Sequence, residues 1–97
     1  MAFAITHFWP GGTQEQYDAD VAVVHPHGGT NLPEGQLFHA AGPVEGGYLV
    51  IAVHESRASW EAFRDGTLLP LAPTVVGGLQ GPPTETDIDL HTLWTAQ

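Results

Sequence analysis

Two stretches of the chain arrange their apolar residues as β-strands do. Residues 2–9, AFAITHFW, form a β-branched and aromatic run that stops at Pro10, which predicts a first strand. Residues 84–94, TETDIDLHTLW, alternate strictly between polar and apolar positions, which predicts a last strand with one face in water. A sheet is therefore expected to take strands from both halves of the sequence.

A helix is expected over residues 13–25. Tyr17 and Val21 are four residues apart and so lie on the same face of a helix. Thr13, followed three residues later by Gln16, is a capping-box pair, which indicates where the helix begins. Tyr17 therefore belongs to the inner, apolar side of this helix.

The middle of the chain predicts a loop rich in Gly and Pro and then two strands, at residues 26–35, 36–42 and 47–55. A four-residue turn at 43–46 would join the strands and place His39 opposite Val50. His54 would then lie on the same face as His39, whereas a shift of one residue would separate them. The register of this hairpin therefore decides whether the two histidines share a face.

A second helix is expected to begin with Ser56 or Ser59 as its cap. Gly66 is expected to interrupt it, because glycine is a poor helix former. A shorter piece would restart at Thr67, a plausible second cap. The apolar side of the first piece consists of aromatic residues, Trp60 and Phe63.

The predicted order β-α-β-β-α-β is that of the ferredoxin-like α+β fold, an antiparallel four-stranded sheet with both helices on one face. Residues 1–97 are expected to form one such domain. Residues 47–55 would form a central strand, and they are apolar on both faces. Because the helices cover only one face, we expect a homodimer in which the second faces pack sheet against sheet.

Charge and composition exclude several classes of partner. The chain has 11 acidic residues and only two basic ones, Arg57 and Arg64, for a net charge of −9. Nucleic acids and anionic membranes are therefore unfavourable partners. There are no cysteines, no signal-peptide pattern and no long apolar run, so a cytoplasmic protein is expected.

The order of motifs resembles the dimeric α+β barrel superfamily, and within it the small proteins similar to antibiotic-biosynthesis monooxygenases. The resemblance lies in GGTQEQYDA at 11–19, LPEGQLFHAAGPVEGGYLVIAVHES at 32–56 and WEAFRDGTLLPLAP at 60–73. It implies a pocket between sheet and helices, lined by aromatic and a few polar residues, and chemistry that needs no metal or flavin. In similar proteins a histidine is usual at the position of His39, and a tryptophan at that of His54.

His39 and His54 are the candidate catalytic residues. His39 lies in a strand beside small residues that leave room for a ligand, and an imidazole titrates near neutral pH, as a general acid or base requires. His54 departs from the family pattern and indicates altered pocket chemistry. The alternative is that both are packed core residues, and direct contact between them is not expected at a spacing of four strand residues.

The other histidines carry weaker signals. His7, on the first strand, is a candidate substrate-binding residue that could face either the pocket or the dimer interface. His91 is expected on the acidic, solvated side of the last strand. His25 and His27 form an H-P-H pair that could bind a metal with a third histidine, but a histidine at a helix C-terminus is the simpler interpretation, and no metal is expected.

Candidate substrate-binding residues also include the aromatic side chains of the two helices, Tyr17, Trp60 and Phe63, although such residues are commonly core. No phosphate loop, nucleophile elbow or dinucleotide fingerprint is present. The expected function is a small cofactor-free enzyme acting on an apolar, aromatic or polyketide-like molecule by oxygenation, cyclisation or proton transfer. The alternatives are a haem-binding or haem-degrading protein and a non-catalytic small-molecule-binding dimer.

Overall fold

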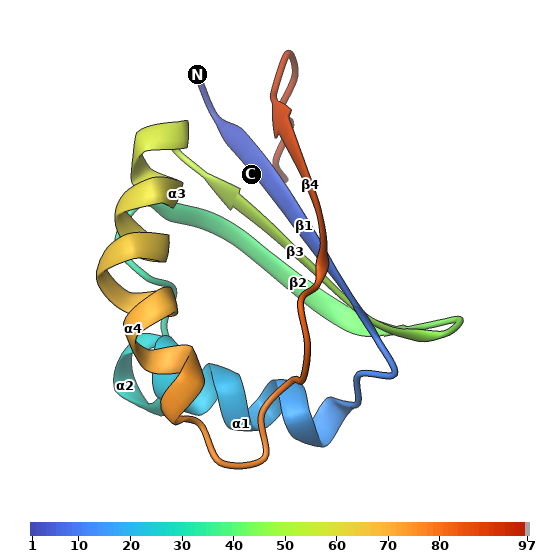
Figure 1. The fold of residues 1–97 in the computed structure, drawn as a ribbon. Coiled ribbons are helices and arrows are strands. Elements are labelled where there is room, and N and C mark those ends of the chain that lie inside the picture. Colours follow the sequence, from blue (N-terminus) through green and yellow to red (C-terminus); the bar gives the residue numbers. More distant parts are fainter. Residues whose placement is uncertain (97) are drawn as a thin grey trace.

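The four strands form one antiparallel sheet with the helices on one side of it (Figure 1). The sheet order is β2-β3-β1-β4, which confirms the predicted ferredoxin-like α+β fold. The computed structural model describes residues 1–96. Its strands and α-helices are β1 (Phe3–Pro10), α1 (Gln14–Val24), α2 (Pro26–Gly29), β2 (Gln36–Val44), β3 (Gly47–His54), α3 (Arg57–Phe63), α4 (Leu69–Leu71) and β4 (Thr84–Asp89).

Helix α1 begins at the predicted capping box. The Gln16 backbone N–H donates to Thr13 Oγ1 at 3.2 Å, and the Thr13 N–H donates to Gln16 Oε1 at 3.0 Å. The helix ends at His25, whose N–H donates to the Val21 carbonyl. The expected loop that follows contains the short α2, where His27 adopts a left-handed φ of 56°.

The β2–β3 hairpin is tighter than predicted. Val44 pairs with Gly47, so the turn has two residues and not four, and Gly46 has a φ of 85° that glycine adopts without strain. His39 therefore lies opposite Ala52 and not Val50. A shift of two residues keeps every side chain on its face, so His39 and His54 lie on the same face of the sheet, one of the two arrangements that the sequence left open.

A β-bulge interrupts strand β2 near its start. Gln36 pairs with His54, but Phe38 pairs with Val53, so Leu37 is the extra residue. In a regular strand, residues 36 and 39 would lie on opposite faces because they are three apart. The bulge places Gln36 and His39 on the same face, toward the helices.

The second helix is not broken at Gly66. Helix α3 begins at Ser56, whose Oγ accepts from the Ser59 N–H at 3.0 Å, and continues through a π-helical turn at Arg64–Leu68 into α4 and a 3-10 turn at Ala72–Thr74. Thr67 does not cap a new helix, contrary to the prediction. Pro70 has no N–H and its ring would clash with the carbonyl four residues before it, so the wider turn accommodates it without a break.

Strand β4 is shorter than predicted and ends at Asp89. His91 therefore lies beyond the strand, exposed, and not on its acidic side. Two acidic residues on that side of β4 are paired with a basic residue. Arg57 forms ion pairs with Asp87 at 3.1 Å and Asp89 at 3.3 Å. The Arg57 guanidinium also lies over the Phe3 ring, 4.4 Å from its centroid.

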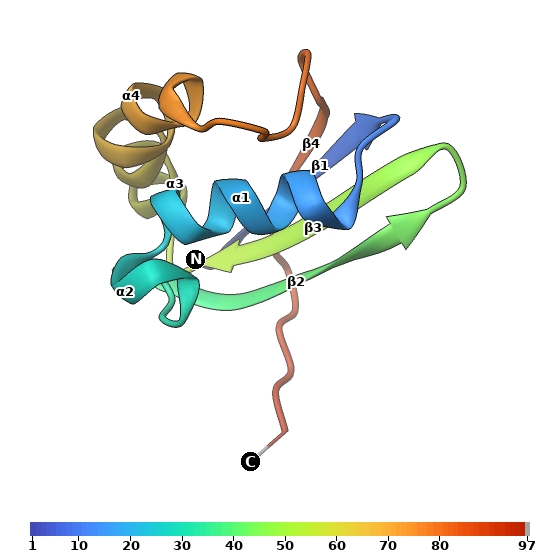
Figure 2. The same cartoon turned by 90° about the horizontal axis from the view of Figure 1, so that it is seen from below.

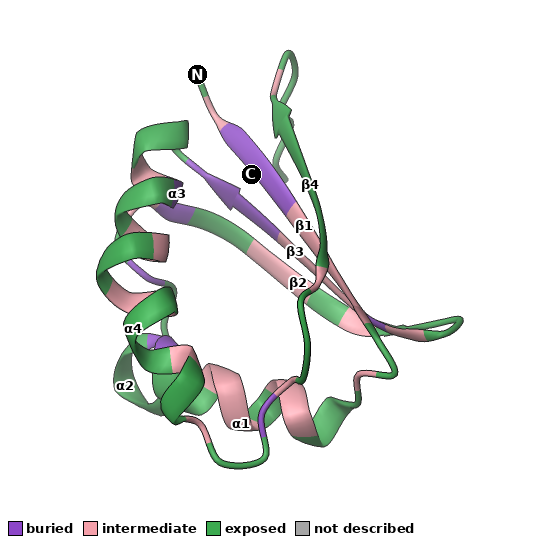
Figure 3. Ribbon diagram, in the orientation of Figure 1, coloured by how far each residue is buried: buried purple, intermediate pink, exposed green. Residues whose placement is uncertain are grey.

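The core lies between the sheet and α3, and the other sheet face has no helix over it (Figures 2 and 3). The core consists of Phe3, Ile5, Ala52 and Trp60, with Phe63 and Leu68 packed against it. On the opposite face, Phe38 and Ile88 are each 46% exposed. None of the helices within residues 1–96 is both long and apolar enough to cross a membrane.

Candidate functional site

A cavity of about 280 Å³ lies between the sheet and the helices. It is called the inner cavity below. Its wall is largely aromatic and aliphatic, and it includes five of the six predicted site residues: His7, Tyr17, His39, Trp60 and Phe63. The sixth, His54, is fully buried behind the wall, with no exposed surface. The two candidate catalytic histidines therefore do not line one cavity together.

Tyr17 and His39 form the polar centre of the inner cavity. Tyr17 projects from α1, and its hydroxyl is hydrogen-bonded to His39 Nε2 at 2.5 Å. The Tyr17 ring also stacks on Tyr48 of β3, with centroids 5.2 Å apart. Tyr17 therefore points inward, as predicted, and its hydrogen bond and ring stacking fix the position of its oxygen.

His39 and His54 are linked through a glutamine. His39 Nδ1 lies 2.9 Å from Gln36 Oε1, and Gln36 Nε2 lies 3.1 Å from His54 Nε2. His54 Nδ1 in turn lies 3.1 Å from the hydroxyl oxygen of Ser59 on α3. These five residues, called the buried chain below, are Tyr17, His39, Gln36, His54 and Ser59.

The hydrogen positions in the buried chain follow from the glutamine amide. Its carbonyl oxygen can only accept, so His39 Nδ1 carries a proton and His39 Nε2 accepts from the Tyr17 hydroxyl. Its NH₂ group can only donate, so His54 Nε2 is unprotonated and His54 Nδ1 donates to Ser59. Both imidazoles are therefore held as the neutral Nδ1–H tautomer.

Burial keeps these imidazoles uncharged. The pKa of His39 falls to about 4, mainly because of burial and to a smaller degree because of the nearby His25 and His54. Burial also lowers the pKa values of His25 and His54. It raises the pKa of Tyr17, and so do Tyr48 and Asp18 to a smaller degree. At neutral pH the Tyr17–His39 pair is thus a neutral phenol donating to a neutral imidazole, and His39 is not an imidazolium acid.

Two acidic residues, Asp20 and Glu85, also line the inner cavity. His7 Nε2 is paired with Glu85 at 2.8 Å, and the His7 ring packs on Trp60. The Asp20 carboxylate accepts from the Leu79 N–H at 2.9 Å, and burial raises the pKa of Asp20. His7 therefore faces the cavity and not the opposite sheet face.

His25 and His27 point to different environments. His25 is buried, with its ring packed edge-on against His39 at a centroid distance of 4.7 Å, whereas His27 is exposed. Within residues 1–96, no group of three His, Cys, Asp or Glu side chains is close enough to hold a metal ion. His25 instead acts as a wall of the inner cavity.

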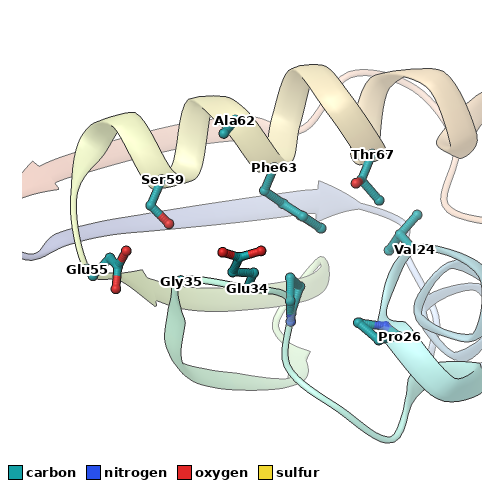
Figure 4. Close-up of a pocket in the computed structure, with 10 residues that line it drawn as sticks. Val24, Pro26, Glu34, Gly35, Glu55, Ser59, Ala62, Phe63 and Thr67 are labelled. Carbon is teal, nitrogen blue, oxygen red and sulfur yellow. The ribbon is translucent and has the colours of Figure 1, made fainter.

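A second, more open cavity of about 400 Å³ lies on the other side of Phe63 (Figure 4). It is called the outer cavity below. Ser59 of α3 lines it together with Glu34 and Glu55, whose carboxylates are drawn facing the same space in Figure 4. The buried chain therefore begins at the inner cavity and ends at the outer one.

Sequence reasoning missed Gln36, Ser59 and the position of His25. A polar residue after a glycine, as in EGQ, is an ordinary loop signal, and only the bulge brings Gln36 onto the histidine face. The sequence indicates Ser59 only as a possible helix cap. A weak signal was available, because a strand that faces a buried histidine needs some other polar residue to satisfy both ring nitrogens.

Acid should destabilise the protein through its buried histidines. The folded-state pKa of His39, about 4, lies below its ordinary value of 6.5, so the unfolded chain binds protons first as the pH falls. The stabilising contribution is complete above pH 6.5 and is lost as the pH falls toward 4. We expect His39→Gln to show a shallower fall in melting temperature between pH 7.5 and 5 than wild type.

The matched control for that measurement is His91→Gln, which removes an exposed histidine. Its melting temperature should follow the wild-type pH dependence. Parallel curves for wild type and both variants would contradict a buried, neutral His39.

No family model and no curated protein sequence matches this chain. The solved structure of Rv0793 from Mycobacterium tuberculosis is similar to it, with a TM-score of 0.57 and 19% sequence identity. The likeness covers 99% of this chain and 98% of that one. At this identity the comparison shows a shared fold over the whole domain, which agrees with the observed strand order.

Proposed function

We propose that the protein is a small enzyme that acts on a neutral, hydroxylated aromatic molecule without a bound cofactor. The observation that carries this proposal is the Tyr17–His39 hydrogen bond inside an aromatic-lined cavity. A phenol whose hydroxyl is held by an imidazole is a suitable group for orienting a substrate hydroxyl and for proton transfer. The resemblance to antibiotic-biosynthesis monooxygenases favours oxygenation or cyclisation as the reaction class.

The charges of the inner cavity support a neutral substrate. Its acidic lining residues, Asp20 and Glu85, would repel an anion, and burial keeps His25 and His39 neutral, so these two histidines do not compensate. The basic residue of the wall, Arg64, is paired with Asp65 at 2.8 Å. The aromatic walls favour a planar ligand, and the volume of about 280 Å³ lies near the lower end for ligand pockets.

We also propose that the protein is a homodimer. The sheet face away from the helices carries Phe38 and Ile88, each 46% exposed, in one row with Val53 and Ala4 of the neighbouring strands. An apolar face of this kind is best covered by a second copy, sheet against sheet, as in the dimeric α+β barrels that the sequence resembles. The inner cavity lies on the other side of the sheet.

The dimer should be visible as a solution mass of twice the 10.3 kDa chain mass in light scattering after size exclusion. Ile51→Lys places a charge in the centre of the proposed interface and is expected to halve that mass. Glu45→Lys, at the exposed tip of the hairpin, is the control and should leave the dimer intact. A wild-type protein that stays monomeric at micromolar concentrations would end the dimer proposal.

One observation favours a second candidate, a non-catalytic protein that binds the same class of molecule. With its pKa lowered to about 4, His39 is a weak base, and the raised pKa of Tyr17 opposes proton transfer between the two. Such a pair recognises a ligand well but transfers protons slowly. A haem-binding function has less support, because both ring nitrogens of His39 and of His54 are already hydrogen-bonded within the buried chain.

The test is a panel of neutral polycyclic phenols, measured for binding by calorimetry and for turnover in air. The enzyme proposal expects binding together with conversion of at least one member above the rate without protein. Binding without conversion across the panel would favour the non-catalytic candidate. Absence of binding across the panel would overturn both.

A further inference from the structure

We propose that Gln36 is a positioning residue that locks the tautomers of His39 and His54 to each other, so that the hydrogen-bonding state of Tyr17 in the inner cavity is coupled to that of Ser59 in the outer cavity. The inference rests on the geometry of the buried chain. It deepens the proposed function, because it determines which ligand groups Tyr17 can recognise.

The coupling follows from the two unlike ends of an amide. Gln36 presents its oxygen to His39 at 2.9 Å and its nitrogen to His54 at 3.1 Å, so one end accepts and the other donates. If His39 carries its proton on Nδ1, so does His54. If the amide turned over, both rings would have to carry the proton on Nε2. In a mixed pair, one ring would carry its proton on Nδ1 and the other on Nε2. One ring nitrogen would then face a Gln36 group of its own kind, donor against donor or acceptor against acceptor.

A mixed pair is costly here because the chain is shielded from water. His54 is 0% exposed and Gln36 is 7% exposed, so a lost hydrogen bond cannot be replaced by solvent. The buried side-chain N and O atoms of the described residues all have partners. The buried chain therefore has two complete arrangements, and the placement of Gln36 Oε1 toward His39 and Nε2 toward His54 corresponds to the Nδ1–H arrangement.

The two arrangements give Tyr17 opposite properties. In the Nδ1–H arrangement the Tyr17 proton is donated to His39 Nε2, so the Tyr17 oxygen can only accept from a ligand. In the reverse arrangement His39 Nε2–H donates to Tyr17, and the Tyr17 hydroxyl is free to donate. The observed arrangement thus selects a ligand that brings its own donor, such as a phenol O–H, over its methyl ether.

The far end of the chain responds in the same way. Ser59 accepts from His54 Nδ1 in the observed arrangement, which leaves its own proton available to the outer cavity. In the reverse arrangement that proton is donated to His54. Figure 4 shows the Ser59 side chain pointing from α3 toward the space in which the carboxylates of Glu34 and Glu55 lie, and these carboxylates are acceptors for such a proton.

The experiment is ¹⁵N NMR of the histidine side chains at pH 7.5 without ligand, where the shifts of Nδ1 and Nε2 identify the tautomer. The wild-type protein should show His39 and His54 both as Nδ1–H. In Gln36→Glu the carboxylate accepts at both ends, so His54 should change to Nε2–H while His39 keeps Nδ1–H. Gln80→Glu, an exposed residue bonded to a loop carbonyl, should change neither.

Opposite tautomers for the two rings in the wild-type protein would overturn the proposal, whether or not the variant folds. An unchanged His54 tautomer in folded Gln36→Glu would overturn it as well. A residue with only a packing role would not move the tautomer of one histidine and spare the other. Because no ligand is added, the result is independent of the turnover panel, so the proposed function can fail while the coupling stands.

Discussion

Tyr17→Phe is expected to lower turnover of a phenolic substrate about 100-fold or more while leaving the fold intact. The change removes only the hydroxyl, and a positioned acid or base typically contributes a factor of about 10² to 10⁴. The phenyl ring would keep its stacking on Tyr48 at 5.2 Å, so the shape of the inner cavity is preserved. The measurement is kcat and KM for the best substrate of the panel, with the melting temperature as a check on folding.

The matched control is Tyr48→Phe. Tyr48 is buried, at 4% exposure, and packs against Tyr17, but its hydroxyl is not part of the buried chain. Loss of the Tyr48 hydroxyl should change kcat by less than about threefold, because Tyr48 does not line the inner cavity and His39 is hydrogen-bonded to Tyr17 instead. Equal losses in the two variants would show that packing and not the Tyr17 hydroxyl is responsible.

Phe3→Ala is expected to have the largest effect on stability, a loss of about 3 to 5 kcal/mol in the free energy of unfolding. Phe3 is 1% exposed and belongs to the core cluster with Ile5 and Trp60. The Arg57 guanidinium lies over the Phe3 ring. The variant would therefore remove this cation–π contact in addition to leaving a cavity in the core. For a domain of 97 residues such a loss is a large part of the total stability.

Chemical denaturation at pH 7.5 would measure the effect. Val76→Ala, at a position 94% exposed, is the control and should change stability by no more than about 0.5 kcal/mol. Because the core lies on the helix side of the sheet, Phe3→Ala should destabilise the monomeric Ile51→Lys protein by a similar amount. A loss confined to the dimer would place Phe3 at the interface and contradict the described packing.

The fold was accessible from the sequence because local signals and topology agreed. The capping box at Thr13, the apolar first strand and the glycine-rich hairpin all indicated the elements that the structure contains. The errors lie where a tertiary constraint overrides a local preference. Gly66 remains helical because the wider π-helical turn accommodates Pro70 without a break. The hairpin turn has only two residues because Gly46 adopts a positive φ.

The site was only partly accessible, and the reason is the bulge at Leu37. Strict alternation would put Gln36 and His39 on opposite faces, so no periodic pattern predicts that they are bonded. His39, Tyr17, Trp60 and Phe63 were found by residue type and helical or strand position. The link between His39 and His54 depends on one irregular residue, which pattern reasoning cannot place.

The neutrality of the buried chain has a consequence for ionic strength. None of its five members carries a formal charge at pH 7.5 in the observed arrangement, so added salt has no charges to screen there. The Arg57 ion pairs lie at the surface and weaken as salt is added. Ligand recognition by Tyr17 can therefore remain constant across salt concentrations that weaken the ion pairs at the surface.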